Sequence, residues 1–109
     1  MDRMTPRREA LDVSKHQGVI DWSAAHAAGV NLCSMRATTG TIITSRYRKI
    51  VDGHDGPIGG MYVDGQFRAN RANAKAAGVR HRLFYHLLNG TRSLEAQADH
   101  FLATCPLNN

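Results

Sequence analysis

The chain has 109 residues, of which 42% are hydrophobic, and 14 Lys and Arg against nine Asp and Glu give it a formal net charge of +5. This length favours one domain, and no run of about 18 apolar residues is present, so a membrane-spanning helix is not expected. The basic N-terminal stretch has no apolar segment behind it, so no secretory signal peptide is visible and the location is left open.

The first half of the chain predicts a strand, a helix and a second strand. A short apolar run predicts a strand at 10–14, and Asp21 is a suitable N-cap for an alanine-rich helix at 22–28. Gly29 ends this helix as a left-handed cap. A strand is expected at 30–37, directly after the cap.

The second half repeats this unit after an irregular segment. Residues 41–60 are basic and rich in glycine, and we expect a surface insertion there. Alanines at helical spacing predict a helix at 65–77, which Gly78 ends, and a strand follows at 80–88. A last helix is expected at 93–104, with its first serine as N-cap and a proline just beyond it.

Alternating strands and helices predict an α/β fold in which parallel strands are covered by helices. Right-handed crossovers leave two architectures open, a doubly wound sheet and a (β/α) barrel. Neither G-x-G-x-x-G nor G-x-x-x-x-G-K occurs, so no phosphate-binding loop is expected. In both architectures, functional residues gather at the carboxyl ends of the strands.

Each of the three predicted strands ends in polar residues. Together they offer a carboxylate, an imidazole, an amide, a guanidinium and a phenol, a set that suits a ligand with many hydroxyl and amide groups, such as a sugar. The candidate site residues are Asp12, His16, Gln17, Arg36, Tyr85 and His86.

Each candidate also has a structural interpretation. Aspartate at a strand end is typical of a turn, and His16 and Gln17 are favoured to orient the loop rather than to contact a ligand. The two candidates of the third strand fit a groove wall and a core position equally well. Arg36 is expected to pair with Asp12 across adjacent strands, which would keep that carboxylate ionised. Trp22 is expected in the core.

Several motifs in order resemble the family 25 glycoside hydrolases. The match covers about residues 10–105, with 41–60 as its large break. The segments are LDVSKHQG at 11–18 and IDW at 20–22 for G-I-D-V-S-x-H-Q-G…I-D-W, RATTG at 36–40 for K/R-A-T-E-G, YVD at 62–64 with Phe67 and Asn70 for Y-x-D-x-x-F-x-x-N, FYH at 84–86 for A-Y-H-F, and QADHF at 97–101 for the third helix.

The resemblance implies a lysozyme-type muramidase, which hydrolyses the glycosidic bond after N-acetylmuramic acid in peptidoglycan. It implies an incomplete TIM-like (β/α) barrel, of which residues 1–109 would form the N-terminal three β/α units of a partial catalytic domain. It also implies that Asp12 is the active-site aspartate of the first strand, and that peptidoglycan glycan strands are the partner.

Two departures from the family pattern concern the chemistry. The nine acids contain no D-x-E, the motif of the family's key acids, and Thr39 stands where the family usually has glutamate. Glycoside hydrolysis needs a protonated carboxyl beside the leaving oxygen. We therefore expect this chain to be inactive by itself. The alternative is a non-catalytic wall-binding fragment that uses the basic segment and the Asp12 region, and the open sheet edge is expected to allow self-association.

Charge and cysteine patterns limit other functions. Eight basic residues against three acidic ones lie between Arg46 and Arg82, which favours an acidic partner but is also typical of a solvated face. No pair of aromatic residues interleaves these arginines, so nucleic-acid binding is not expected. Cys33 and Cys105 form no C-x-x-C, Cys33 is expected as a buried thiol, and histidine spacing predicts neither a metal site nor a cofactor.

Overall fold

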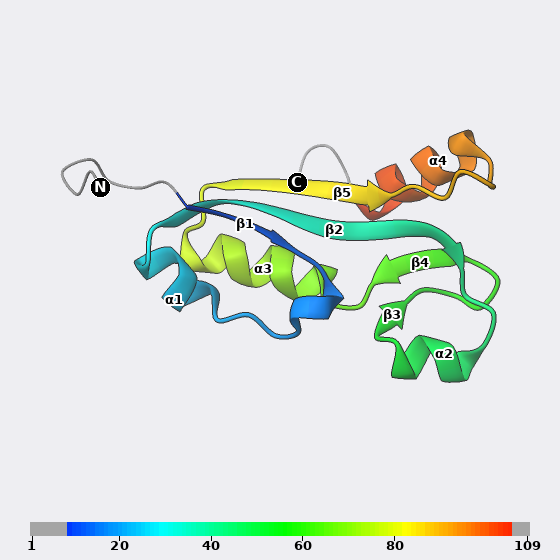
Figure 1. Ribbon diagram of the computed structural model, residues 1–109, viewed down its shortest axis with the longest axis horizontal. Helices are drawn as coiled ribbons and strands as arrows, with labels where there is room; N and C mark the ends of the chain where they lie inside the picture. The colour runs from blue at the N-terminus through cyan, green and yellow to red at the C-terminus, as the bar shows by residue number, and fades with distance from the viewer. Residues whose placement is uncertain (1–8, 106–109) are drawn as a thin grey trace.

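A single sheet organises the computed structural model, which describes residues 9–105 (Figure 1). Its central strand pairs in parallel with β1 and β5 and antiparallel with β4, which in turn pairs with β3. The parallel pairs are those that the sequence predicts. The strands are β1 (Glu9–Val13), the central β2 (Val30–Ile42), β3 (His54–Asp55), β4 (Met61–Asp64) and β5 (His81–Leu87).

The helices begin and end close to the predicted residues because their caps are local. The Asp21 side chain accepts a hydrogen bond from Ala24 N at 3.0 Å, and the Ser93 side chain accepts one from Ala96 N at 3.1 Å. Gly78 ends its helix in the left-handed conformation, with φ of 92°. The helical segments are the short η1 (Lys15–Gln17), α1 (Trp22–Ala27), α2 (Arg46–Val51), α3 (Phe67–Ala77) and α4 (Leu94–Thr104).

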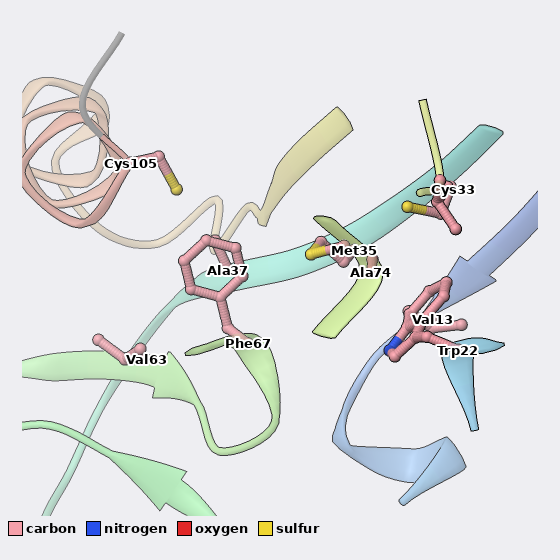
Figure 2. Packing of buried hydrophobic residues seen from close by; sticks show 10 residues of the cluster. Val13, Trp22, Cys33, Met35, Ala37, Val63, Phe67, Ala74 and Cys105 are labelled. Carbon is pink, nitrogen blue, oxygen red and sulfur yellow. The ribbon is translucent and has the colours of Figure 1, made fainter. Parts of the chain in front are cut away.

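The core lies between the sheet and the helices α1 and α3, which pack on the same face (Figure 1). Phe67, Met35 and Cys33 are fully buried there (Figure 2). The Phe67 ring meets the Phe84 ring edge to face, with centroids 5.2 Å apart. Trp22 is buried too, as predicted, and its Nε1 donates to Asn70 Oδ1 at 3.2 Å. Burial also raises the pKa of the Cys33 thiol, in agreement with the expected buried cysteine.

Helix α4 is positioned by Gln97, a buried glutamine that packs against a glycine of β2. Its Oε1 accepts from Asn89 N at 2.9 Å, and its Nε2 donates to Asn89 O at 2.8 Å. A Cβ at Gly40 would lie 2.1 Å from Gln97 Oε1, so the close approach of α4 depends on this glycine.

No helix within residues 9–105 is long and apolar enough to cross a membrane.

The segment at 41–60 is more structured than the sequence suggests. Strand β2 continues to Ile42, five residues beyond its predicted end, and the expected surface insertion contains α2 and β3. The register of β2 against β5 shifts between Arg36 and Thr38, and the part of β2 beyond this shift pairs with β4. Strands of two and four residues have too short an alternating pattern to be detected from sequence.

Candidate active site

A buried carboxylate, that of Asp64, joins three elements at the carboxyl end of the sheet. Arg36 Nε donates to Asp64 Oδ2 at 2.8 Å, Lys15 N donates to the same oxygen at 2.9 Å, and Gln66 N donates to Oδ1 at 2.9 Å. Asp64 is 1% exposed, and the ion pair and hydrogen bonds together make its burial tolerable. These contacts hold the loop after β1, the strand β2 and the start of α3 in one arrangement.

The predicted ion pair between Arg36 and Asp12 is wrong, since the Arg36 guanidinium pairs with Asp64 instead. Asp12 lies opposite Ser34, and β1 ends with Val13 opposite Met35. Arg36 therefore lies beyond the last residue of β1, where the antiparallel β4 supplies the neighbouring side chain. The YVD segment at 62–64 was the sequence signal that could have indicated this partner, but its aspartate, Asp64, was given no role.

Asp12 itself lies on the open face of the sheet. Its neighbour Val13 is in the core with Trp22, and successive strand side chains point to opposite faces, so Asp12 points away from α1. The pKa of Tyr85 is raised, first by burial and then by the negative charges of Asp12 and Asp64, while Arg36 lowers it. Asp12 and Tyr85, on the two outer strands of the parallel part, therefore lie within electrostatic reach of each other.

His16 and Arg36 line a pocket of about 220 Å³ beside these residues. We call this the hairpin pocket, because the β3–β4 hairpin forms one of its walls. Its lining residues are Lys15, His16, Arg36, Thr39, Thr41, Arg48, His54, Tyr62 and Leu87. The pocket and the open-face residues form what we call the mouth, whose predicted members are Asp12, His16, Arg36 and Tyr85.

The other two candidates, Gln17 and His86, make internal contacts. Gln17 Oε1 accepts from Ser14 N at 2.6 Å and completes a capping box of η1, which is the loop-orienting interpretation. His86 contacts Thr38 Oγ1 through Nδ1 at 2.7 Å and Gln97 Oε1 through Nε2 at 2.8 Å. His86 thus lies toward α4, on the side of the sheet that the helices cover.

Sequence reasoning gave no site role to two aromatic side chains of the hairpin. The rings of His54 and Tyr62 stack with centroids 3.9 Å apart. The pKa of His54 is lowered from 6.5 to about 4, first by burial and then by the charges of Lys15 and Arg36, with Asp64 and Asp52 opposing. Tyr62 was visible in the YVD segment, whereas His54 lies in the glycine-rich stretch and had no pattern around it.

The mouth offers hydrogen-bonding groups and one exposed carboxylate, that of Asp12. The Asp64 carboxylate accepts three hydrogen bonds from nitrogen donors, so its oxygens are engaged within the protein. Within residues 9–105, no group of three or more His, Cys, Asp and Glu is arranged to hold a metal ion. The geometry therefore favours binding of a polar ligand over proton transfer.

Comparison with known proteins gives matches over part of their length. No protein-family model matches the chain. Lysozyme M1 of Streptomyces globisporus is 31% identical over 93 residues, which are 85% of this chain and 25% of that protein. The chain thus spans about a quarter of the length of this curated relative.

Three solved structures match 84% or more of the chain. A bacterial lysozyme from Streptomyces coelicolor has 33% identity and a TM-score of 0.63, covering 86% of this chain and 35% of that one. A muramidase from Trichobolus zukalii has 26% identity and a TM-score of 0.61, covering 84% and 35%. A family 25 glycosyl hydrolase from Bacillus anthracis, at 24% identity, has the same fold with a TM-score of 0.69 over 97% and 39%. These matches confirm the predicted resemblance and the partial (β/α)-barrel fold.

Proposed function

We propose, from the partial match of this chain to the family 25 glycoside hydrolases, that its mouth binds the glycan strands of peptidoglycan. The enzyme activity that goes with this site is hydrolysis of the bond between N-acetylmuramic acid and N-acetylglucosamine. One observation carries the proposal. Asp12 is exposed at the end of β1, on the open face of the sheet, within electrostatic reach of Tyr85 on β5. Ligands of parallel α/β folds bind at this end of the strands.

The 109-residue chain is proposed to bind without cleaving. Glycosidases generally use two carboxyl groups, roughly 5 to 10 Å apart, one of which donates a proton to the leaving oxygen. Asp12 supplies one such group, and Asp64 is engaged with Arg36 and two backbone N–H groups. General acid catalysis contributes about 10² to 10⁴-fold, so its loss leaves little measurable activity.

A paired assay tests this proposal. The purified chain is incubated with peptidoglycan sacculi, sedimented, and assayed for bound protein, and the turbidity of the same suspension is followed. We expect co-sedimentation without a fall in turbidity. Failure to co-sediment would remove the binding proposal, whereas clearing of the suspension that Asp12→Asn abolishes would show that one exposed carboxylate is sufficient for cleavage.

A second candidate function is wall binding through a basic groove on α3, away from the mouth. This helix groove has a volume of about 340 Å³ and is lined by four cationic side chains and one alanine, namely Arg68, Arg71, Ala72, Lys75 and Arg82. The Arg71 guanidinium carbon lies 5.6 Å from the centre of the Phe84 ring and 5.8 Å from that of Phe67, which fixes its position. Arg68 pairs with Asp55, and the other three cations of the groove favour an anionic polymer as ligand.

Salt separates the two candidates. Binding through the helix groove is expected to weaken steeply as the ionic strength rises from about 0.05 to 0.5 M, because exposed charges are screened over a Debye length. Lys75→Gln with Arg82→Gln should then abolish co-sedimentation, and Asp12→Asn should not. Binding through the mouth predicts the opposite pattern for these variants.

A further inference from the structure

Residues that line the hairpin pocket carry most of the buried side-chain polar atoms that have no partner within the described chain. Four buried side-chain nitrogen or oxygen atoms have no hydrogen-bond partner within residues 9–105. Three of them, Arg36 Nη2, Tyr62 Oη and His54 Nδ1, belong to residues that line this pocket. Tyr62 is 3% exposed and Arg36 is 8% exposed. Buried polar groups are almost always hydrogen-bonded, so three such atoms at one pocket point to a ligand.

These three atoms come from three different strands and share one chemistry. Arg36 lies on β2, His54 on β3 and Tyr62 on β4. A guanidinium N–H and a phenol O–H are donors, and a neutral imidazole donates through one of its nitrogens. A single group that accepts several hydrogen bonds would satisfy all three, which is a property of carboxylate and phosphate oxygens.

The charge of the residues around the pocket also favours an anionic ligand. Lys15, Arg36 and Arg48 all line it. The nearby carboxylates are already engaged, Asp64 with Arg36 at 2.8 Å and Asp52 with Arg48 at 3.0 Å. Three cations against two carboxylates leave a net positive charge. Thr39 stands where the family that this chain resembles usually has glutamate. It adds a hydroxyl group to the lining and no negative charge.

We infer that the hairpin pocket binds a small oxyanion, a carboxylate or phosphate group, through Arg36, His54 and Tyr62. Within the proposed function, on which only this part of the inference rests, the oxyanion belongs to a wall polymer bound at the mouth. The lactyl carboxylate of N-acetylmuramic acid is one source, and a phosphate of an anionic wall polymer is the other. A volume of about 220 Å³ accommodates one such group and not a whole sugar chain.

Nuclear magnetic resonance titration of the whole chain tests the oxyanion chemistry alone. Inorganic phosphate and acetate are added at constant ionic strength, with chloride as the reference anion. We expect the ring signals of His54 and Tyr62 to shift saturably with phosphate or acetate and not with chloride. The pKa of His54, which lies at about 4, should rise on binding because an anion favours the imidazolium. Lys15, Arg36, Asp52, Asp64 and the Tyr62 ring face this histidine, so their signals are followed as well.

Two pocket variants and one control make the result specific. Tyr62→Phe should weaken phosphate binding by about 5-fold or more, since one hydrogen bond to a charged group is lost. His54→Gln provides a second test if Tyr62→Phe is unfolded. The exposed His81 on β5 gives the matched control, and His81→Gln should bind like the unmodified chain. Shifts of equal size with chloride, or unchanged affinity in both pocket variants, would overturn the inference.

The source of the oxyanion is then tested with three small ligands. N-acetylmuramic acid differs from N-acetylglucosamine by the lactyl group, which bears the carboxylate, and glycerol phosphate carries the phosphate. Preference for N-acetylmuramic acid that disappears in Tyr62→Phe supports the carboxylate source, and preference for glycerol phosphate supports the phosphate source. If inorganic phosphate binds and neither sugar binds at the mouth, the oxyanion inference is supported and the proposed function is contradicted.

Discussion

The two faces of the sheet differ although they are formed by the same strands. On the face that α1 and α3 cover, Met35 and Phe67 are fully buried and Val13 is nearly so. On the opposite face, Leu83 is 58% exposed, and Asp12 is exposed in the same row of the sheet, with Ser34 of β2 between them. One face carries the apolar contacts that stabilise the fold, and the other presents polar groups and exposed leucines to solvent.

The difference separates the residues that stabilise the fold from the residues that are available to bind a ligand. Alternation along a strand assigns odd and even positions to different tasks, so a residue can be exchanged on one face with little effect on the other. The mouth is the exception, because the buried pair of Arg36 and Asp64 contributes to both. Substitutions on each face test that separation.

Phe67→Ala should give the largest loss of stability. The side chain is fully buried in the core and meets Phe84 edge to face, and removal of a buried phenylalanine costs about 3–5 kcal/mol through lost transfer energy and a residual cavity. Urea denaturation monitored by circular dichroism measures the free energy of unfolding.

The matched control lies on the open face. Leu83→Ala should change the free energy of unfolding by about 0.5 kcal/mol or less, because most of the side chain already contacts solvent. If exposed leucines drive self-association, Leu83→Ala should also lower it in sedimentation runs at several concentrations. Equal costs for the two variants would mean that the faces do not differ as described.

Asp64→Asn should destabilise the chain by roughly 3 kcal/mol, because it leaves the buried Arg36 guanidinium without its counter-charge. The same urea experiment measures this loss, and Asp99→Asn, at an exposed position on α4, serves as the control with little change. A loss as small as that of the control would show that the ion pair does not organise the mouth.

Gly40→Ala should cost about 1–3 kcal/mol, since a Cβ at this position meets the Gln97 amide and Asn89. The Gln97 amide must leave its position, which removes its hydrogen bonds to Asn89 and loosens α4. Hydrogen exchange of the α4 amides would detect this. Gly90 has open space around its Cα, so Gly90→Ala is the control that should leave both stability and exchange unchanged.

The pH dependence of stability should show the lowered pKa of His54. Between about pH 6.5 and about pH 4 the unfolded chain binds a proton on this histidine and the folded chain does not. Stability from His54 is therefore present above pH 6.5 and decreases as the pH falls toward 4. Urea midpoints measured across this window should fall less steeply in His54→Gln, and His81→Gln should keep the original slope.

Local features were predictable from the sequence. The side chains of Asp21 and Ser93 cap their helices by accepting hydrogen bonds from backbone N–H groups three residues further along the chain. Gly78 supplies the left-handed conformation that ends α3. The parallel direction of β1, β2 and β5 followed from the alternation of strands and helices, whereas their order in the sheet did not. These signals depend on a few neighbouring residues, so no tertiary structure is needed to recognise them.

The arrangement of the mouth was predictable only in part. Asp12 lies near the end of β1 and His16 in the turn after it, as expected, but Arg36 lies within β2, and its partner is 28 residues away on an antiparallel strand. Pairing over such a distance depends on the register shift in β2 and on the short β3–β4 hairpin. His54 has no motif around it, and its position follows only from the hairpin that carries it.

The account depends most directly on the role of Asp12 at the mouth. The decisive measurement is titration of the isotope-labelled chain with a muropeptide, compared between the unmodified chain, Asp12→Asn and the control Asp99→Asn. We expect Asp12→Asn to weaken binding by about 10-fold, the loss of one charge-assisted hydrogen bond, so that the signals of Tyr85 and Arg36 shift only at about 10-fold higher muropeptide concentration. Unchanged affinity in Asp12→Asn, with the control also unchanged, would contradict the central claim and leave Asp12 as a turn residue at the end of β1.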